Sequence, residues 1–217
     1  MKKIAILFDL DGTLIDSTDA ILNGFDAAFL AHGKPTPDKS YAKSLIGYTL
    51  EDIFTSLGAP KDEVASYIKA YREYYLPVFL SQTKLLPRAK EAIELAHSFA
   101  NLGIVTTKNS NKLPELLDVL GVREYFNVLV GRNDVTRPKP DAEPILTALE
   151  RLKFNGGLKD VFMIGDTPLD SLAAKAAGVN AISVLCGYAS FSTLLEYNDK
   201  IFDTTFDAVE FVKTIAG

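Results

Sequence analysis

Two carboxylates and a glycine come directly after the first apolar run of the chain. Residues 4–8 are apolar without interruption, and Asp9, Asp11 and Gly12 follow them. Such a run is typical of a strand buried on both faces of a parallel sheet. Aspartate and glycine are poor strand formers, so we expect the strand to end here. Because alternate residues of an extended segment point the same way, Asp9 and Asp11 should converge just beyond its carboxyl end.

Carboxylates placed this closely can carry chemistry. They repel each other unless a cation or a shared proton relieves the repulsion. Their oxygens suit Mg²⁺, one carboxylate can attack as a nucleophile, and the other can carry a proton. The alternative is that Asp9 and Asp11 only end the strand, because Asp-Gly is a common turn sequence. The other predicted strand ends help to separate the two interpretations.

A hydroxyl and a lysine follow two of those strands. Thr106 lies near the end of a strand predicted over 103–107, where a hydroxyl and nearby backbone N–H groups can bind phosphate. Lys139 lies between Pro138 and Pro140, which restrict the backbone and make the lysine a positioned cation. The alternatives are a β-branched strand residue and a solvated lysine in a surface loop.

A second acidic pair follows a later strand. Asp166 ends a strand predicted over 160–166, and Asp170 lies one helical turn further on. Both carboxylates can face the end of the sheet and bind a hard cation, or they can serve only as a helix cap and a complement to the helix dipole. A parallel sheet would bring all these strand ends to one edge, which favours a site for phosphoryl transfer with Mg²⁺.

The elements that must position these residues alternate along the chain. From residue 84 onward, the sequence predicts helices that alternate with strands. The helices are at 88–100, 113–120, 170–177 and 206–215, with one capped by Asp141 and a weaker one at 191–196. The strands are at 103–107, 127–131, 160–166, 180–185 and 201–202. This order predicts right-handed βαβ units. Residues 16–83 instead predict helices without any strand. We therefore expect an α/β fold: a doubly wound, Rossmann-like parallel sheet from residues 1–15 and 84–217, with an all-helical cap of residues 16–83 inserted in it. Two chain crossings are what a hinge needs.

Composition excludes several classes of function. The chain has 217 residues, a net charge of −5 and no basic run, so nucleic acid is not an expected partner. No apolar run approaches the roughly 20 residues that cross a bilayer, so no membrane is expected either. A single cysteine, Cys186, excludes an internal disulfide, and with no export signal it predicts a cytoplasmic protein.

Taken together, the motifs resemble the haloacid dehalogenase superfamily in its phosphatase branch. The resemblance rests on Asp9-Leu-Asp-Gly-Thr-Leu14, on Thr106, on Lys139 within Arg-Pro-Lys-Pro, and on Gly165-Asp-Thr167 with Asp170. It extends over essentially the whole chain, including the inserted cap, and is most similar to members of the phosphoglycolate phosphatase type. The four motifs are specific for the superfamily but not for the substrate.

The resemblance implies a role for each matched residue. Asp9 would be the nucleophile that forms an aspartyl-phosphate, and Asp11 the general acid and base. Mg²⁺ would be bound by the carboxylates of Asp9 and Asp166 and by the backbone carbonyl of Asp11, with Asp170 behind these ligands. Phosphate oxygens would be held by the set Gly12, Thr106, Thr107 and Lys139. Related phosphatases commonly have Asn where this chain has Thr107; we expect the chemistry to survive this change.

The cap would choose the substrate. The resemblance places a cap loop over the site, which makes Lys43, Gly47 and Tyr48 candidate substrate contacts. Tyr48 could equally be a packing residue, and we interpret Tyr71, Tyr74, Tyr75, His32, His97 and Cys186 as structural.

The expected partner is a small phosphorylated metabolite, and the chain could be a monomer or a homodimer. The leading prediction is a Mg²⁺-dependent phosphatase. A sugar-phosphate mutase like β-phosphoglucomutase, a nucleotidase and a pyrophosphatase remain open as alternatives. A phospho-accepting signalling domain also remains open, although the predicted cap disfavours it.

Overall fold

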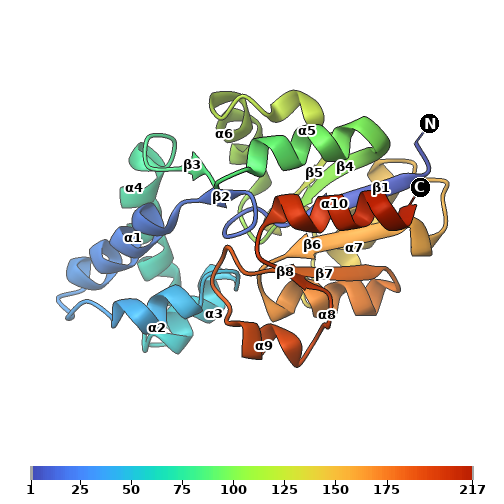
Figure 1. The fold of residues 1–217 in the computed structure, drawn as a ribbon. Coiled ribbons are helices and arrows are strands. Elements are labelled where there is room, and N and C mark those ends of the chain that lie inside the picture. Colours follow the sequence, from blue (N-terminus) through green and yellow to red (C-terminus); the bar gives the residue numbers. More distant parts are fainter. Residues whose placement is uncertain (1, 217) are drawn as a thin grey trace. The chain divides into compact units, whose positions relative to one another are not determined.

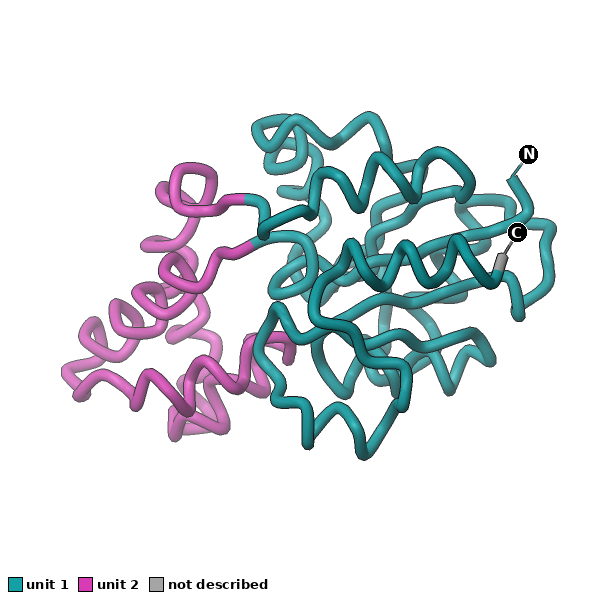
Figure 2. The backbone as a smooth tube through the Cα atoms, in the orientation of Figure 1, with its two compact units in different colours: residues 1–15, 85–217 teal, residues 16–84 magenta. Residues whose placement is uncertain are grey.

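The computed structural model describes residues 2–216 and divides into two compact units, which are shown in separate colours in Figure 2. Residues 1–15 and 85–217 form the core unit, and residues 16–84 form the helical unit. The boundary predicted after residue 83 lies one residue from this division.

The core unit is built on a parallel sheet of six strands (Figure 1). Their order is β5-β4-β1-β6-β7-β8, with parallel pairing throughout. The strands are β1 Ile4–Phe8, β4 Ala100–Val105, β5 Val128–Val130, β6 Val161–Gly165, β7 Asn180–Val184 and β8 Ile201–Phe202. The predicted α/β class with a doubly wound sheet is confirmed. The chain order reverses beside β1, which is where open sheets of this kind bind ligands.

Helices cover both faces of the sheet. The core helices are α5 Ala89–Phe99, α6 Leu113–Val119, α7 Glu143–Arg151, α8 Pro168–Ala177, α9 Phe191–Leu195 and α10 Thr205–Ala216, with 3₁₀ turns at Ser110–Lys112, Arg123–Tyr125, Arg132–Asp134 and Leu158–Asp160. Helices α7 and α8 pack on one face, where Leu7 of β1 and Met163 of β6 meet Ile145 and Ala174. In Figure 1, α5 and α10 lie together on the other face. Burial of apolar side chains on both faces explains why the strands are uninterrupted apolar runs.

Two helix starts differ from the prediction. Helix α7 has Ala142 at its N-cap position, whereas the sequence predicted a cap by Asp141. The Asp141 carboxylate instead accepts from the Glu143 N–H, as short acidic side chains do in local turns. Helix α8 begins at Pro168, two residues before the predicted start, because proline suits the first helical turn.

The helical unit has an aromatic core of its own. Its helices are α1 Thr18–Ala31, α2 Lys39–Ser44, α3 Leu50–Ser56 and α4 Val64–Val78. The rings of Phe25 and Tyr71 stack with centroids 5.3 Å apart, and those of Tyr71 and Tyr75 at 5.2 Å. His32 stacks on Tyr67 at 3.7 Å. The structure thus confirms that Tyr71, Tyr75 and His32 are packing residues.

Two short strands lie where the chain passes between the units. Strands β2 Ile15–Asp16 and β3 Lys84–Leu85 pair with each other, and Lys84 lies 3.4 Å from the Asp16 carboxylate. The expectation of no strand from Asp16 onward was wrong at this point. Two residues are too few to show an alternating pattern in a sequence. Among residues 2–216, no helix combines the length and the apolar character needed to cross a bilayer.

Candidate active site

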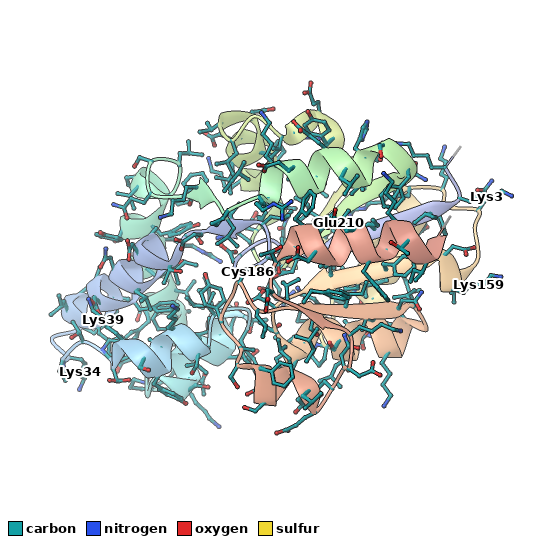
Figure 3. All side chains as sticks on the ribbon, in the orientation of Figure 1. Lys3, Lys34, Lys39, Lys159, Cys186 and Glu210 are labelled. Atoms are coloured by element: carbon teal, nitrogen blue, oxygen red, sulfur yellow. The ribbon has the colours of Figure 1, made fainter. Side chains whose placement is uncertain are left out.

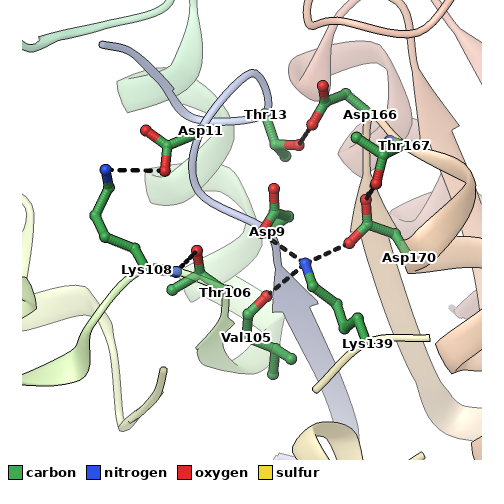
Figure 4. Close-up of polar contacts among 10 residues, drawn as sticks. All are labelled: Asp9, Asp11, Thr13, Val105, Thr106, Lys108, Lys139, Asp166, Thr167 and Asp170. Atoms are coloured by element: carbon green, nitrogen blue, oxygen red, sulfur yellow. Dashed lines mark hydrogen bonds and ion pairs between the residues drawn. The ribbon is translucent and has the colours of Figure 1, made fainter. Parts of the chain in front are cut away.

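Polar side chains gather beyond the carboxyl ends of three adjacent strands (Figure 4). Asp9 follows β1, Thr106 follows β4 and Asp166 follows β6. Strand β4 ends at Val105, earlier than predicted, so Thr106 is the first residue beyond the sheet. Parallel strands explain why residues far apart in the sequence share one edge. Figure 3 draws the described side chains on the same ribbon, with Cys186 labelled.

Lys139 is the central cation of the site. Its ammonium lies 2.7 Å from an Asp9 oxygen and 2.6 Å from an Asp170 oxygen, and it donates to the Val105 carbonyl at 3.1 Å. The three side chains are between 2% and 4% exposed. Burial alone would lower the pKa of Lys139, but the Asp170 and Asp9 carboxylates together raise it above the usual lysine value. Lys139 is therefore a fixed positive charge beside Asp9.

The carboxylates of Asp9 and Asp166 resist ionisation here. Burial raises the pKa of Asp9 to about 7; Lys139 opposes that rise, while Asp170 and Asp11 add to it. Burial, with Asp9 and Asp170 nearby, also raises the pKa of Asp166 well above its usual value. More negative charge is concentrated at this edge than one lysine neutralises, so a further cation would relieve it.

Asp166 is fixed from several sides. Its Oδ1 accepts from the Thr13 hydroxyl at 3.0 Å, and its Oδ2 accepts from the Tyr188 N–H at 2.9 Å. A Cβ atom on Gly12 or on Gly187 would overlap this carboxylate. Gly12 also has a φ of +80°, which side chains rarely adopt. The sequence pattern did not indicate Thr13, Gly187 or Tyr188 as supports of Asp166. Only Thr13, inside the first motif, carried a signal that could have indicated one.

Asp170 is held within the first turn of α8. Its Oδ2 accepts from both the N–H and the hydroxyl of Thr167, at 3.1 and 2.7 Å, while its Oδ1 accepts from Lys139. The bond from the Thr167 N–H to the Asp170 carboxylate is one half of a capping box at the start of the helix. Asp170 thus links the helix start to the central lysine.

Asp11 lies apart from the other carboxylates, with Lys108. The Lys108 ammonium is 3.1 Å from Asp11 Oδ2, and the two side chains are each 11% exposed. The side chains of Asp9 and Asp11 therefore contact different lysines. Lys108 was not among the residues that the sequence pattern singled out. Its position two residues beyond Thr106 was the available signal.

The predicted phosphate-binding positions lie around this edge. The Thr106 hydroxyl accepts from the Lys108 N–H at 3.2 Å, and Thr106 is buried. Thr107 is half-buried beside it. The Gly12 N–H donates to the Ile15 carbonyl at 2.9 Å, so this particular amide is already engaged within its turn.

The candidate substrate contacts of the cap belong to the helical unit. Lys43 is exposed on α2, and Tyr48 is 41% exposed in the following loop. Gly47 has a φ of +111°, so the loop turns there. In the core unit, burial raises the pKa of the Cys186 thiol, whose sulfur lies 3.4 Å from the Gly12 carbonyl. This environment fits the interpretation of Cys186 as a packing residue.

Three of the carboxylates could hold a metal ion together. One oxygen from each of Asp9, Asp166 and Asp170 lies within 4.8 Å of the others, and all three residues are buried. The donors are all hard oxygens, and the excess negative charge described above needs a cation. The set therefore fits Mg²⁺, which prefers a few carboxylates and completes its octahedron with water. Asp170, expected behind the ligands, is a member of this cluster.

Comparison with known proteins gives a consistent result. A family model described as haloacid dehalogenase-like hydrolase matches residues 6–184. A candidate pyrophosphatase, PpaX, of Caldanaerobacter subterraneus is 32% identical over all of this chain and 96% of its own length. A phosphoglycolate phosphatase of Neisseria gonorrhoeae is 34% identical over 90% of this chain and 85% of its own length. A solved hydrolase of the haloacid dehalogenase-like family from Streptococcus pneumoniae is 29% identical, with a TM-score of 0.86 over 96% of this chain and 97% of its own.

Proposed function

Because the chain belongs to the haloacid dehalogenase-like hydrolase family, we propose that it is a Mg²⁺-dependent phosphatase that hydrolyses a small phosphomonoester through an aspartyl-phosphate on Asp9. The observation that carries the proposal is the buried contact of Asp9 with Lys139 beside Asp166 and Asp170. A nucleophile that must approach a phosphate dianion needs positive charge at the same place.

The carboxylates of Asp9 and Asp166 and the backbone carbonyl of Asp11 would bind the Mg²⁺. The neighbouring Asp170 would either lie behind these ligands or be a further ligand. The bound ion would neutralise charge on the phosphoryl oxygens during the reaction. Thr13 and the Tyr188 N–H orient the Asp166 carboxylate for this task.

The proposed reaction has two halves. In the first, an Asp9 oxygen bonds to phosphorus, the ester P–O bond breaks, and Asp11 gives its proton to the departing oxygen. In the second, water loses a proton to Asp11 and attacks phosphorus, and the Asp9–phosphate bond breaks to release phosphate. Splitting one displacement into two easier steps is the advantage of a covalent route.

Charge and hydrogen bonds would hold the phosphoryl group in both halves. Lys139 supplies a fixed ammonium, and the Thr106 hydroxyl and the segments around Gly12 and Thr107 would donate to the remaining oxygens. The burial of Lys139 supports this role, since an ammonium acts more strongly where water is excluded.

The substrate is proposed from the relatives. The name phosphoglycolate phosphatase recurs among them, which favours 2-phosphoglycolate or a similar small ester. Pyrophosphate is the second candidate, because the PpaX relative matches the whole chain. Lys43, Gly47 and Tyr48 of the helical unit would contact the leaving group. We propose a cytoplasmic enzyme, acting as a monomer or homodimer on a small metabolite, without a nucleic acid or membrane partner.

The test is phosphate release from a panel of compounds, with Mg²⁺ and with a chelator. The panel holds 2-phosphoglycolate, pyrophosphate, sugar phosphates and nucleoside monophosphates. We expect Mg²⁺-dependent release with one preferred compound. Isomerisation of a sugar phosphate without net release would indicate a mutase instead. A stable phosphoprotein without turnover would indicate a signalling domain.

A further inference from the structure

The ion pair between Lys108 and Asp11 is the part of the site that the proposed reaction leaves unexplained. The two charged groups lie 3.1 Å apart, each 11% exposed. The ion pairs at the surface are much more open; Lys69 and Glu73, for example, are 79% and 68% exposed. Figure 4 shows the Lys108 pair on the other side of Asp9 from Asp170. A largely shielded ion pair inside a site restrains its partners more than one in solvent does.

The backbone of Lys108 is also fixed. Its N–H donates to the Thr106 hydroxyl at 3.2 Å, and its carbonyl accepts from the Arg132 N–H at 3.0 Å. A Cβ on Gly131 would overlap that carbonyl, so the close approach requires glycine there. The lysine stem therefore starts from a defined point beyond β4, and its reach to Asp11 is built into the loop.

We propose that Lys108 is a positioning residue for Asp11. The inference rests on the proposed function, in which Asp11 must serve the departing oxygen and then the attacking water. The reaction slows whenever a carboxylate on a short, rotatable side chain leaves either of these positions. Lys139 cannot restrain it, because its ammonium lies between Asp9 and Asp170. Lys108 restrains it from the opposite side: its ammonium forms an ion pair with the ionised Asp11 and donates a hydrogen bond to the carbonyl oxygen of the protonated Asp11. It does so without itself bonding to phosphorus or exchanging a proton.

Two substrates separate this role from direct binding of phosphate. Loss of an alkoxide from 2-phosphoglycolate needs the proton of Asp11, whereas p-nitrophenolate departs from p-nitrophenyl phosphate with little help. Water attack in the second half needs Asp11 with both substrates. A fault confined to Asp11 therefore slows alkyl ester cleavage and dephosphorylation, but leaves the first burst of p-nitrophenolate intact.

The experiment compares wild type with Lys108→Met, Lys108→Arg and Lys112→Met in Mg²⁺. Methionine removes the charge but keeps an unbranched stem, and arginine restores a cation that can pair with a carboxylate. Lys112 ends the 3₁₀ turn that follows this loop and pairs with Glu115 at 3.0 Å in a solvent-exposed position, so it is the matched control. Circular dichroism and the thermal midpoint verify that each variant is folded.

For Lys108→Met we expect kcat with 2-phosphoglycolate to fall about 10- to 100-fold with KM nearly unchanged, a part of the usual contribution of general acid–base catalysis. The rate of the p-nitrophenolate burst stays within about threefold of wild type, because that step needs little acid. Lys108→Arg recovers most of kcat, and Lys112→Met matches wild type.

Three results would overturn the inference. They are unchanged kcat in Lys108→Met, a burst slowed as much as alkyl ester cleavage, or a rise in KM alone, which would mean that Lys108 binds substrate directly. Failure of the proposed function is visible separately. In that case wild type itself releases no phosphate from either compound.

Discussion

The Lys139 ammonium lies 2.7 Å from the Asp9 carboxylate, and both side chains are almost completely shielded from water. The same ammonium lies 2.6 Å from Asp170, so one buried cation contacts two buried carboxyl groups. Burying charges costs free energy, and removing one member of such a set leaves the others uncompensated. The catalytic arrangement is therefore also a structural one.

Lys139→Met should lower the free energy of unfolding by about 3–5 kcal/mol, because the Asp9 and Asp170 carboxylates lose their shared cation. Urea unfolding at neutral pH in a chelator measures it. Lys69→Met, which removes an exposed lysine 3.9 Å from Glu73, should change the free energy by less than about 1 kcal/mol. Equal effects of the two substitutions would contradict the structural role of Lys139.

Gly187→Ala should weaken Mg²⁺ binding without unfolding the protein. The added Cβ would overlap the Asp166 carboxylate and displace it from the Tyr188 N–H. Supports of this kind are worth about 10- to 100-fold in metal affinity, so half-maximal activity should need at least about tenfold more Mg²⁺. A titration of activity with Mg²⁺ measures the shift.

Gly157→Ala is the control for that substitution. Gly157 has a φ of −78° and lies beside Asp160, in a turn that contributes nothing to the site. Its Mg²⁺ titration should match wild type. An unchanged titration in Gly187→Ala would mean that Asp166 is not held by this loop.

The metal-free protein should lose stability as pH rises from about 4 to about 7. Burial raises the pKa of Asp9 to about 7, against 3.8 for the ordinary group, so the folded state binds more protons than the unfolded state in this window. Stability falls with pH wherever the folded state holds the extra proton. Asp166 is shifted in the same direction.

Thermal midpoints in a chelator between pH 4 and pH 8 measure this effect. Groups with lowered pKa values, such as Asp134, act in the opposite sense and mainly below this window. In Asp9→Asn the decline should be smaller, and Mg²⁺ should reduce it in wild type because the cation takes the place of the protons. Identical profiles for wild type and Asp9→Asn would contradict the assignment to Asp9.

Asp9→Asn should abolish turnover, with kcat lower by about 10³-fold or more, as expected when a nucleophile is removed. An amide cannot form the acyl phosphate, although its remaining oxygen can still bind Mg²⁺ weakly. Phosphate release measures turnover. Acid quenching after incubation with a radioactive substrate measures whether the protein retains a phosphoryl label. A labelled Asp9→Asn protein, or turnover near wild type, would exclude Asp9 as the nucleophile.

Most of the core unit could be predicted because its signals are local. Uninterrupted apolar runs give the strands, and polar residues directly after them mark the edge where Asp9, Thr106 and Asp166 meet. Parallel pairing then requires no further information to bring them together. The class of fold follows from the same alternation of strands and helices.

The rest depends on contacts between loops, which leave no period in a sequence. The Lys108–Asp11 pair needs the turn after β4 to face the turn after β1. The support of Asp166 by Tyr188 comes from a backbone N–H, so residue type gives no signal of it. Asp141 was predicted to be a helix cap from its residue type alone, but the helix begins after Ala142.

The aromatic core of the helical unit gives the protein a spectroscopic label of its own. The chain has no tryptophan, and six of its nine tyrosines, Tyr41, Tyr48, Tyr67, Tyr71, Tyr74 and Tyr75, fall in residues 16–84. Three of them, Tyr67, Tyr71 and Tyr75, lie in contact with other rings. Intrinsic fluorescence and near-ultraviolet dichroism therefore report chiefly on that unit. Melting followed by these signals, beside far-ultraviolet dichroism of the whole chain, will show whether the two units unfold together.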